Sequence, residues 1–193
     1  MSQRARRIIS VALMCLGLST AGRAHADSWV APFRGHLGVG WTKLFTPDAP
    51  AGSLSFGTGI DYPVRPTVRL GIDVGYDLLG SRIVEQGSLV ADLNYSAIEL
   101  FALAHWQPSW AGPIGRISLG PGVVAARVTQ SSSGAASFES FTVDEVAGAL
   151  AGSVTLMSRH PAPVRVGLEI DGRYAWLSDT HWPLFGLKLV VHY

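Results

Sequence analysis

The sequence is short of cysteine and of long apolar runs, and each shortage removes a class of protein. Its one cysteine, Cys15, lies in an apolar stretch near the N-terminus, so no disulfide or thiolate chemistry is expected beyond that stretch. After residue 26, no apolar run reaches the roughly 20 residues that a membrane-spanning helix needs. Any membrane crossing therefore has to use strands, and strands in lipid have to close into a barrel.

The N-terminal region carries the three parts of a secretory signal peptide. Arg4, Arg6 and Arg7 precede an apolar run from Ile8 to about Leu18, and a small-residue site, residues 24–26, follows. We predict that residues 1–26 are cleaved and that residues 27–193 form one domain. The removed segment holds four arginines and no acid, so the formal net charge changes from +1 to −3. That charge excludes a nucleic-acid partner.

The end of the chain predicts a strand with one apolar and one mostly polar face. Successive side chains of a strand point to opposite faces. The apolar face consists of the odd positions Phe185, Leu187, Leu189, Val191 and Tyr193.

Seven further segments repeat this alternation, and turn-rich stretches separate them. The first runs from Arg34 to Leu44, and the clearest internal one spans residues 68–78. Residues 79–88 and 129–142 are polar and predict the longest loops. In the fourth segment, Asp92, Asn94 and Ser96 are polar at even positions that are apolar from residue 98 onward, so we predict a β-bulge near residues 96–98. The prediction is an all-β, eight-stranded, antiparallel up-and-down transmembrane β-barrel.

An even strand count places both ends of the barrel on one side, which we predict to be the periplasm. The aromatic residues then sort by height, as in a membrane barrel with two aromatic girdles. Tyr62, Trp106 and Tyr193 fall at the periplasmic end, and Trp41, Tyr76, Trp176 and Phe185 fall at the extracellular end. A soluble lipocalin-like barrel has the opposite polarity and no reason for this sorting.

Over essentially its whole mature length, the chain resembles small outer-membrane barrels of the OmpA/OmpX-like type. The resemblance implies that the closing segment, Phe185, Leu187, Leu189, Val191 and Tyr193, is the signal read by the barrel-assembly machinery. It also implies contact with outer-membrane lipid and lipopolysaccharide, and no cofactor. No peptidoglycan-binding domain is expected after the barrel.

Most mid-strand charges fall on the face turned away from lipid, and eight strands leave an interior that side chains just fill. We predict a polar network of paired charges in a closed lumen. Its members are Asp61, Arg69, Asp73, Asp77, Glu99, Arg116, Arg165, Glu169, Asp171, Arg173 and Lys188. A gated pore or a small-ligand conduit through this network is the alternative interpretation.

Two basic residues break the lipid-face rule, Lys43 and Arg127, and either could meet lipopolysaccharide phosphates. Ser178, Asp179 and His181 lie close in sequence near the extracellular end, which leaves a lipid A-modifying hydrolase as a remote alternative. Three histidines, at positions 36, 105 and 192, are scattered near the periplasmic end, and we predict no metal site.

The favoured interpretation is a non-enzymatic structural or surface-interaction protein with no catalytic residue, whose protein partner the sequence does not identify.

Overall fold

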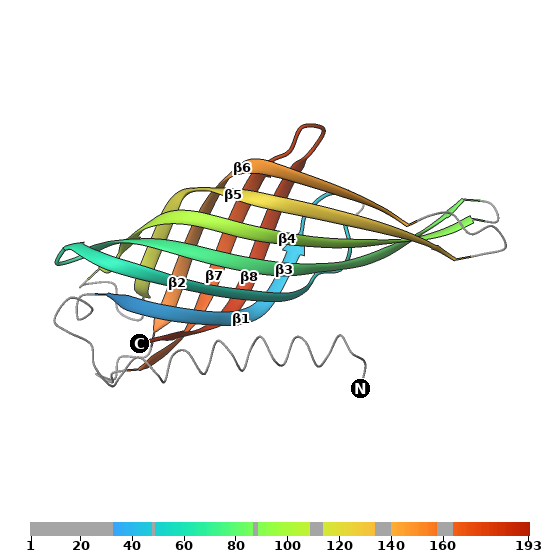
Figure 1. Cartoon of the computed structure of the whole chain (residues 1–193). Helices are drawn as coiled ribbons and strands as arrows, with labels where there is room; N and C mark the ends of the chain where they lie inside the picture. The colour runs from blue at the N-terminus through green and yellow to red at the C-terminus, as the bar shows by residue number, and fades with distance from the viewer. Residues whose placement is uncertain (1–32, 48, 87–88, 109–113, 134–139, 158–163) are drawn as a thin grey trace, which may run out of the picture. The chain divides into compact units, whose positions relative to one another are not determined.

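The computed structural model describes residues 33–47, 49–86, 89–108, 114–133, 140–157 and 164–193, and leaves the side chains of residues 86, 89, 132 and 133 undescribed. The predicted signal peptide, residues 1–26, lies outside these ranges. Eight strands follow one another in chain order (Figure 1). They are β1 (Arg34–Leu44), β2 (Ser53–Arg65), β3 (Val68–Gln86), β4 (Leu89–Trp106), β5 (Ile114–Ser133), β6 (Phe141–Met157), β7 (Arg165–Trp176) and β8 (His181–His192).

Each strand pairs antiparallel with the strands before and after it, and β1 closes the sheet against β8. Leu37 lies opposite Val191 and Trp41 lies opposite Leu187 across this closing seam. The predicted fold class, an eight-stranded antiparallel barrel, is confirmed. Within the described residues, no helix is long and apolar enough to cross a membrane.

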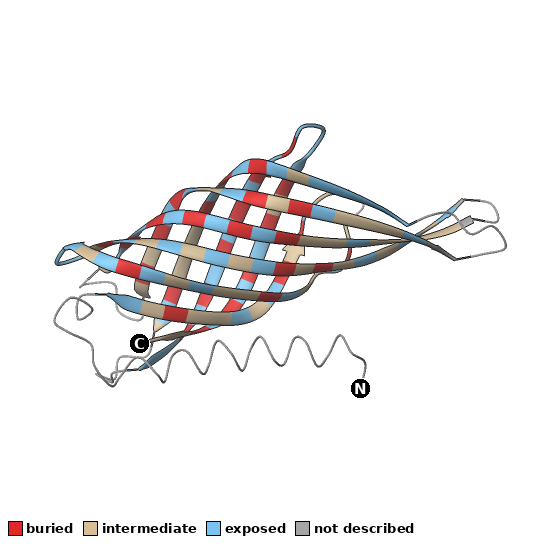
Figure 2. Cartoon of the chain, in the orientation of Figure 1, coloured by how far each residue is buried: buried red, intermediate tan, exposed pale blue. Residues whose placement is uncertain are grey.

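The barrel turns its apolar side chains outward and its polar ones inward, so exposed and buried residues alternate along the strands (Figure 2). In β7, Ile170 on the outer face is 40% exposed, whereas Arg173 on the inner face is 5% exposed. This polarity is the reverse of a soluble barrel and follows directly from the two-residue period of the strands.

The strands β3 to β6 run past the ends of the other four (Figure 1). The partner strand β2 reaches only Asp77 of β3, and β7 pairs with β6 only from Gly148 onward. The four strands therefore form a projecting sheet, which we define as residues 78–86 of β3, 89–96 of β4, 127–133 of β5 and 141–147 of β6. We call this end of the barrel the hairpin end, and the opposite end, where β1 begins and β8 finishes, the terminal end.

The predicted long loops at residues 79–88 and 129–142 are wrong, because most of these residues continue the strands of the projecting sheet. The side chains of these residues are polar because the residues lie beyond the barrel wall. Polar residues can still form the backbone hydrogen bonds of a sheet.

The predicted bulge near residues 96–98 of β4 is also wrong, since the extra residue is Leu79 of β3. Strand β4 keeps its alternation, with Glu99 inside and Ile98 outside. Gly80 follows the bulge with a φ of 95°, a value that favours glycine.

The interior has two chemically distinct parts, whereas the sequence predicted only its polar network. Charged residues fill the part nearer the terminal end, together with Phe101, Leu103 and Val190, and a packed apolar cluster fills the hairpin side. We call the latter the apolar layer, and it includes Leu44, Leu79, Ala126, Ala147, Ala175, Leu177, Trp182 and Leu184. Tyr95 and Val128, at the base of the projecting sheet, pack against it.

Candidate functional site

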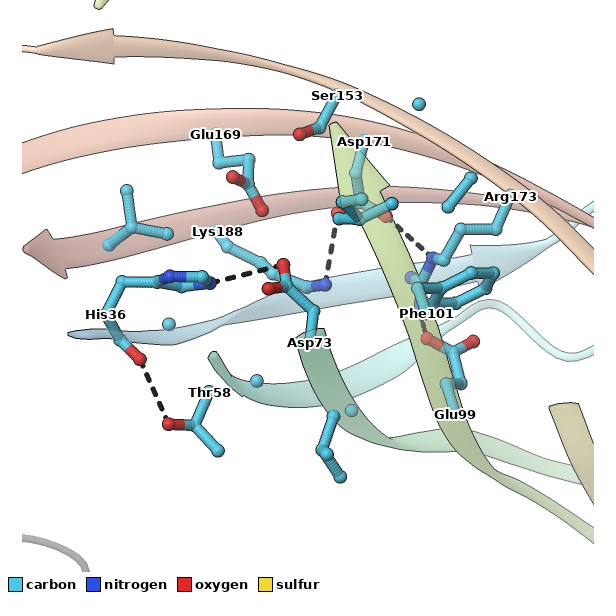
Figure 3. Close-up of a pocket in the computed structure, with 18 residues that line it drawn as sticks. His36, Thr58, Asp73, Glu99, Phe101, Ser153, Glu169, Asp171, Arg173 and Lys188 are labelled. Carbon is cyan, nitrogen blue, oxygen red and sulfur yellow. Dashed lines mark hydrogen bonds and ion pairs between the residues drawn. The ribbon is translucent and has the colours of Figure 1, made fainter. Parts of the chain in front are cut away.

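The interior charges form two clusters, the first centred on the guanidinium of Arg173. Nη1 of Arg173 donates to Asp77 at 2.5 Å. It also donates to Glu99, and Nε lies 2.7 Å from Asp171 (Figure 3). Its remaining nitrogen, Nη2, donates to the hydroxyl of Thr42 at 2.8 Å. Together with Lys188, whose Nζ lies 3.2 Å from Asp171, these residues form what we call the Arg173 cluster.

The second cluster is centred on Arg116, nearer the terminal end. Nη2 of Arg116 donates to Glu169 at 2.9 Å, and the hydroxyl of Thr155 donates to the same carboxylate oxygen at 3.0 Å. Asp61 pairs with Arg69 and lies 3.9 Å from Nη1 of Arg116. Buried charges paired in this way cross-link strands that are far apart in the sequence.

Three histidines that look scattered in the sequence meet inside the barrel. The ring of His36 lies 5.3 Å from that of His192 and 6.4 Å from that of His105, measured between ring centroids. His36 uses both nitrogens: Nε2 lies 3.2 Å from Asp73, and Nδ1 lies 3.4 Å from Nη1 of Arg116. Among the described residues, no group of three or more His, Cys, Asp or Glu side chains is arranged to hold a metal ion.

A cavity of about 50 Å³ lies between the two clusters. His36 and Asp73 line it from one side and Glu99, Asp171 and Arg173 from the other (Figure 3). A water molecule needs roughly 10–15 Å³ of such space, so the cavity accommodates about three to five.

The structure places ten of the eleven predicted network residues in the interior. The exception is Arg165, which begins β7 and is exposed at the terminal end. Alternation along the strand alone assigns Arg165 to the inner face, but the residue lies at the terminal end of the barrel, where the inner face is open to solvent. The three histidines were noted in the sequence but not assigned to the network, and Thr42 was not predicted, because polar residues on an inner face carry no strong signal of their partners.

The two basic residues predicted to face lipopolysaccharide differ in their surroundings. Arg127 donates two hydrogen bonds to the carboxylate of Asp144, at 2.6 and 3.0 Å, on the outer face of the projecting sheet. These hydrogen bonds hold the pKa of Asp144 below its ordinary value and raise that of Arg127. The ammonium of Lys43 lies 5.1 Å from the centroid of the Phe45 ring, and no carboxylate pairs with it in the described part of the chain.

The residues considered for a hydrolase do not assemble into a dyad. The imidazole of His181 stacks on Tyr174, with centroids 5.7 Å apart. The backbone N–H of Ser178 donates to Glu145 at 2.5 Å, and within the described residues the Ser178 hydroxyl makes no hydrogen bond to His181. Asp179 is exposed.

The closing segment lies as its alternation predicts. Phe185, Leu187, Leu189 and Tyr193 are exposed on the outer face, and Val191 is partly exposed. Tyr193 is fixed by two backbone hydrogen bonds to Gly35, at 3.0 and 3.1 Å.

The fold and the filled interior define a small eight-stranded barrel with an apolar outer surface. Several solved outer-membrane proteins share this fold at low sequence identity. The Yersinia pestis attachment invasion locus protein Ail, solved with the heparin analogue sucrose octasulfate, superposes with a TM-score of 0.52 and 12% identity, over 83% of this chain and 99% of Ail. Neisserial surface protein A gives a TM-score of 0.52 and 13% identity, over 83% of this chain and 94% of its own.

A major outer membrane protein of Thermus thermophilus gives a TM-score of 0.52 and 8% identity, over 83% of this chain and 99% of its own. Scans against protein-family models and curated protein sequences gave no match. The resemblance to small outer-membrane barrels is thus confirmed at the level of the fold.

Proposed function

We propose that this protein is an integral outer-membrane barrel, exported with a cleaved signal peptide at residues 1–26. The outer face carries an aliphatic belt between aromatic residues at both ends, such as Trp106 and Tyr193 at the terminal end and Trp41 and Trp176 at the hairpin end. In this orientation the terminal end faces the periplasm and the projecting sheet stands outside the cell. The similar fold of solved outer-membrane proteins supports this placement.

Its role is surface interaction through the projecting sheet, in keeping with a non-enzymatic protein. The observation that carries this proposal is the pair of sheet edges that no strand of the described chain covers, residues 81–86 of β3 and 141–147 of β6. Such edges present unpaired N–H and C=O groups, and a partner that adds an extended segment as a further strand satisfies them.

The chemistry of the projecting sheet favours a peptide partner over a sulfated sugar such as the sucrose octasulfate solved with Ail. The charge of Arg127 is matched by Asp144, and no cluster of unpaired basic residues is seen among the described residues of this sheet. Ile83 at the β3 edge is 64% exposed, and Phe141 at the β6 edge is 55% exposed, so both edges offer apolar contact beside the backbone groups.

A structural, closed lumen is the second part of the proposal. The apolar layer lies between the charged clusters and the hairpin end, and an ion crossing it would lose its hydration. This favours a plugged interior over the channel interpretation. Single-channel recordings should show no steady conductance at low protein dose, and a stable conductance would favour the channel.

Of the two predicted lipopolysaccharide contacts, we favour Lys43. Its ammonium sits on the outer face beside Phe45 without a carboxylate partner among the described residues, whereas Asp144 already compensates the charge of Arg127. The closing segment, with its outward Phe185 and Tyr193, remains the proposed signal for the barrel-assembly machinery.

The edge proposal is tested with a matched pair of substitutions. Ile83→Lys adds a positive charge on β3, where no β2 residue is paired, and Thr129→Lys adds the same charge on β5, where Thr129 is paired with Asn94 of β4 and Thr142 of β6. Only the first lies on an open edge. With protein in lipid nanodiscs, we expect extended peptides selected for binding to lose at least about tenfold in affinity for Ile83→Lys only. Equal losses for both variants would show that the edge is not the site.

A further inference from the structure

The cavity between the two charged clusters is lined by carboxylate oxygens that lack a donor. Oδ1 of Asp73 and Oε1 of Glu99 are both buried and accept no hydrogen bond from any described residue. The Glu99 side chain is 3% exposed, and both residues line the cavity, Asp73 beside His36 and Glu99 beside Arg173 (Figure 3). Buried acceptors left without a donor are costly, so a group that offers only positive charge or donors fits here.

The charges around the cavity do not balance. Five carboxylates surround it or join its wall through the Arg173 cluster: Asp73, Asp77, Glu99, Glu169 and Asp171. Against them stand three basic side chains, Arg116, Arg173 and Lys188. Asp77 and Glu99 share a single nitrogen of Arg173, which leaves this pair the least compensated. A charged His36, paired with Asp73, would still leave an excess of negative charge.

We propose that the cavity binds one small monovalent cation, sodium or potassium, together with part of its hydration shell. The ion lies between Asp73 and Glu99, and its waters donate to the two oxygens that lack donors. The volume of about 50 Å³ suits an ion with a few waters. Because no three side chains of the described residues converge as direct metal ligands, a hydrated monovalent ion fits better than a chelated divalent one.

This site is independent of the projecting sheet and of peptide binding. Its expected effect is structural, since the ion supplies the positive charge that the Arg173 cluster lacks. A ligand that binds only the folded barrel stabilises it in proportion to the logarithm of ligand concentration.

The test compares thermal unfolding of the lipid-embedded full-length mature barrel in sodium, potassium and N-methyl-D-glucamine chloride, at equal chloride, ionic strength and pH. We expect the unfolding midpoint to be roughly 3 °C or more higher in sodium or potassium and to rise with their concentration. Glu99→Gln and Asp73→Asn should each abolish the difference between cations, while Asp179→Asn, at an exposed carboxylate, should retain it.

Equal midpoints of the wild-type barrel in all three salts would overturn the proposal, because the carboxylates would then be neutralised by protons instead. A full cation dependence in both Glu99→Gln and Asp73→Asn would place any bound ion elsewhere and would equally overturn it. If Glu99→Gln fails to fold, judged by heat-modifiability on a gel, Asp73→Asn decides, since Asp73 lies outside the Arg173 cluster. Broadening of the sodium-23 resonance by wild-type protein, and its loss in Asp73→Asn, provides a readout that does not depend on stability.

Discussion

Arg173 is the residue whose removal should most damage the barrel. Its guanidinium contacts three carboxylates, those of Asp77, Glu99 and Asp171, and donates to the hydroxyl of Thr42. The substitution Arg173→Met keeps most of the apolar side-chain volume and removes the positive charge. It leaves three buried carboxylates with only Lys188 nearby to compensate them.

The magnitude follows from the general cost of breaking a buried ion pair. Removing one partner of such a pair destabilises a protein by about 3–5 kcal/mol, because the other charge stays buried without compensation. Since Arg173 serves three carboxylates, we expect the free energy of unfolding to fall by about 5 kcal/mol, the upper end of that range. Small domains have about 5–15 kcal/mol in total, so the variant should be marginal.

The assay is reversible urea unfolding in lipid vesicles, followed by tryptophan fluorescence and by mobility on unboiled gels. Adding Asp77→Asn and Glu99→Gln to Arg173→Met should recover a large part of the loss, because those carboxylates are then neutral. The control Arg127→Met breaks an ion pair on the exposed sheet and should change stability little. A loss below about 1 kcal/mol for Arg173→Met, or no recovery in the triple variant, would refute the network.

Three further predictions concern other parts of the molecule. A Cβ at Gly120 would lie 1.9 Å from the backbone oxygen of Ala102, whereas one at Gly172 meets nothing within 4 Å, so Gly120→Ala should cost about 1–3 kcal/mol in the same urea assay and Gly172→Ala little. Because Arg127 lowers the pKa of the Asp144 carboxyl, the pair stabilises the fold above the ordinary value of 3.8 and loses this effect as the pH falls through the lower folded value. An NMR titration should therefore show the Asp144 pKa rising in Arg127→Gln. Truncating Trp182 to Ala opens a gap in the apolar layer and should cost about 3–5 kcal/mol, measured by urea unfolding.

The barrel itself could be predicted because the residues expected to face lipid recur with a two-residue period along the strands. In the middle of β1, β7 and β8, apolar residues such as Val39, Ile170 and Leu187 recur at every second position, and the structure places them on the outer face. The same rule fails beyond the barrel wall, where polar residues occur on either face. Residues 79–86 and 129–133 therefore look like loops in the sequence although they are paired strands.

The sequence predicts which residues face the interior but not which of them pair with one another. Parity assigns Asp77, Glu99 and Arg173 to the inner face, but which acid meets which base depends on the stagger between strands β3, β4 and β7 across the lumen. The meeting of His36 and His192 likewise depends on the closing register between β1 and β8, which local sequence does not encode.

The charged part and the apolar layer of the interior together favour a function outside the lumen. Inward positions near the hairpin end carry alanine and leucine, and these small and aliphatic side chains pack against Trp182 and Leu177 in the apolar layer. A charged network open at both ends of the barrel would suit ion conduction. A network covered on one side by the apolar layer suits cross-linking of the barrel wall. In the function proposed above, the barrel is a rigid anchor and the projecting sheet is the surface that meets a partner. Shortening the β3–β4 and β5–β6 hairpins should accordingly abolish peptide binding while leaving the heat-modifiable barrel intact, and loss of the barrel in such a variant would show that the two parts are not separable.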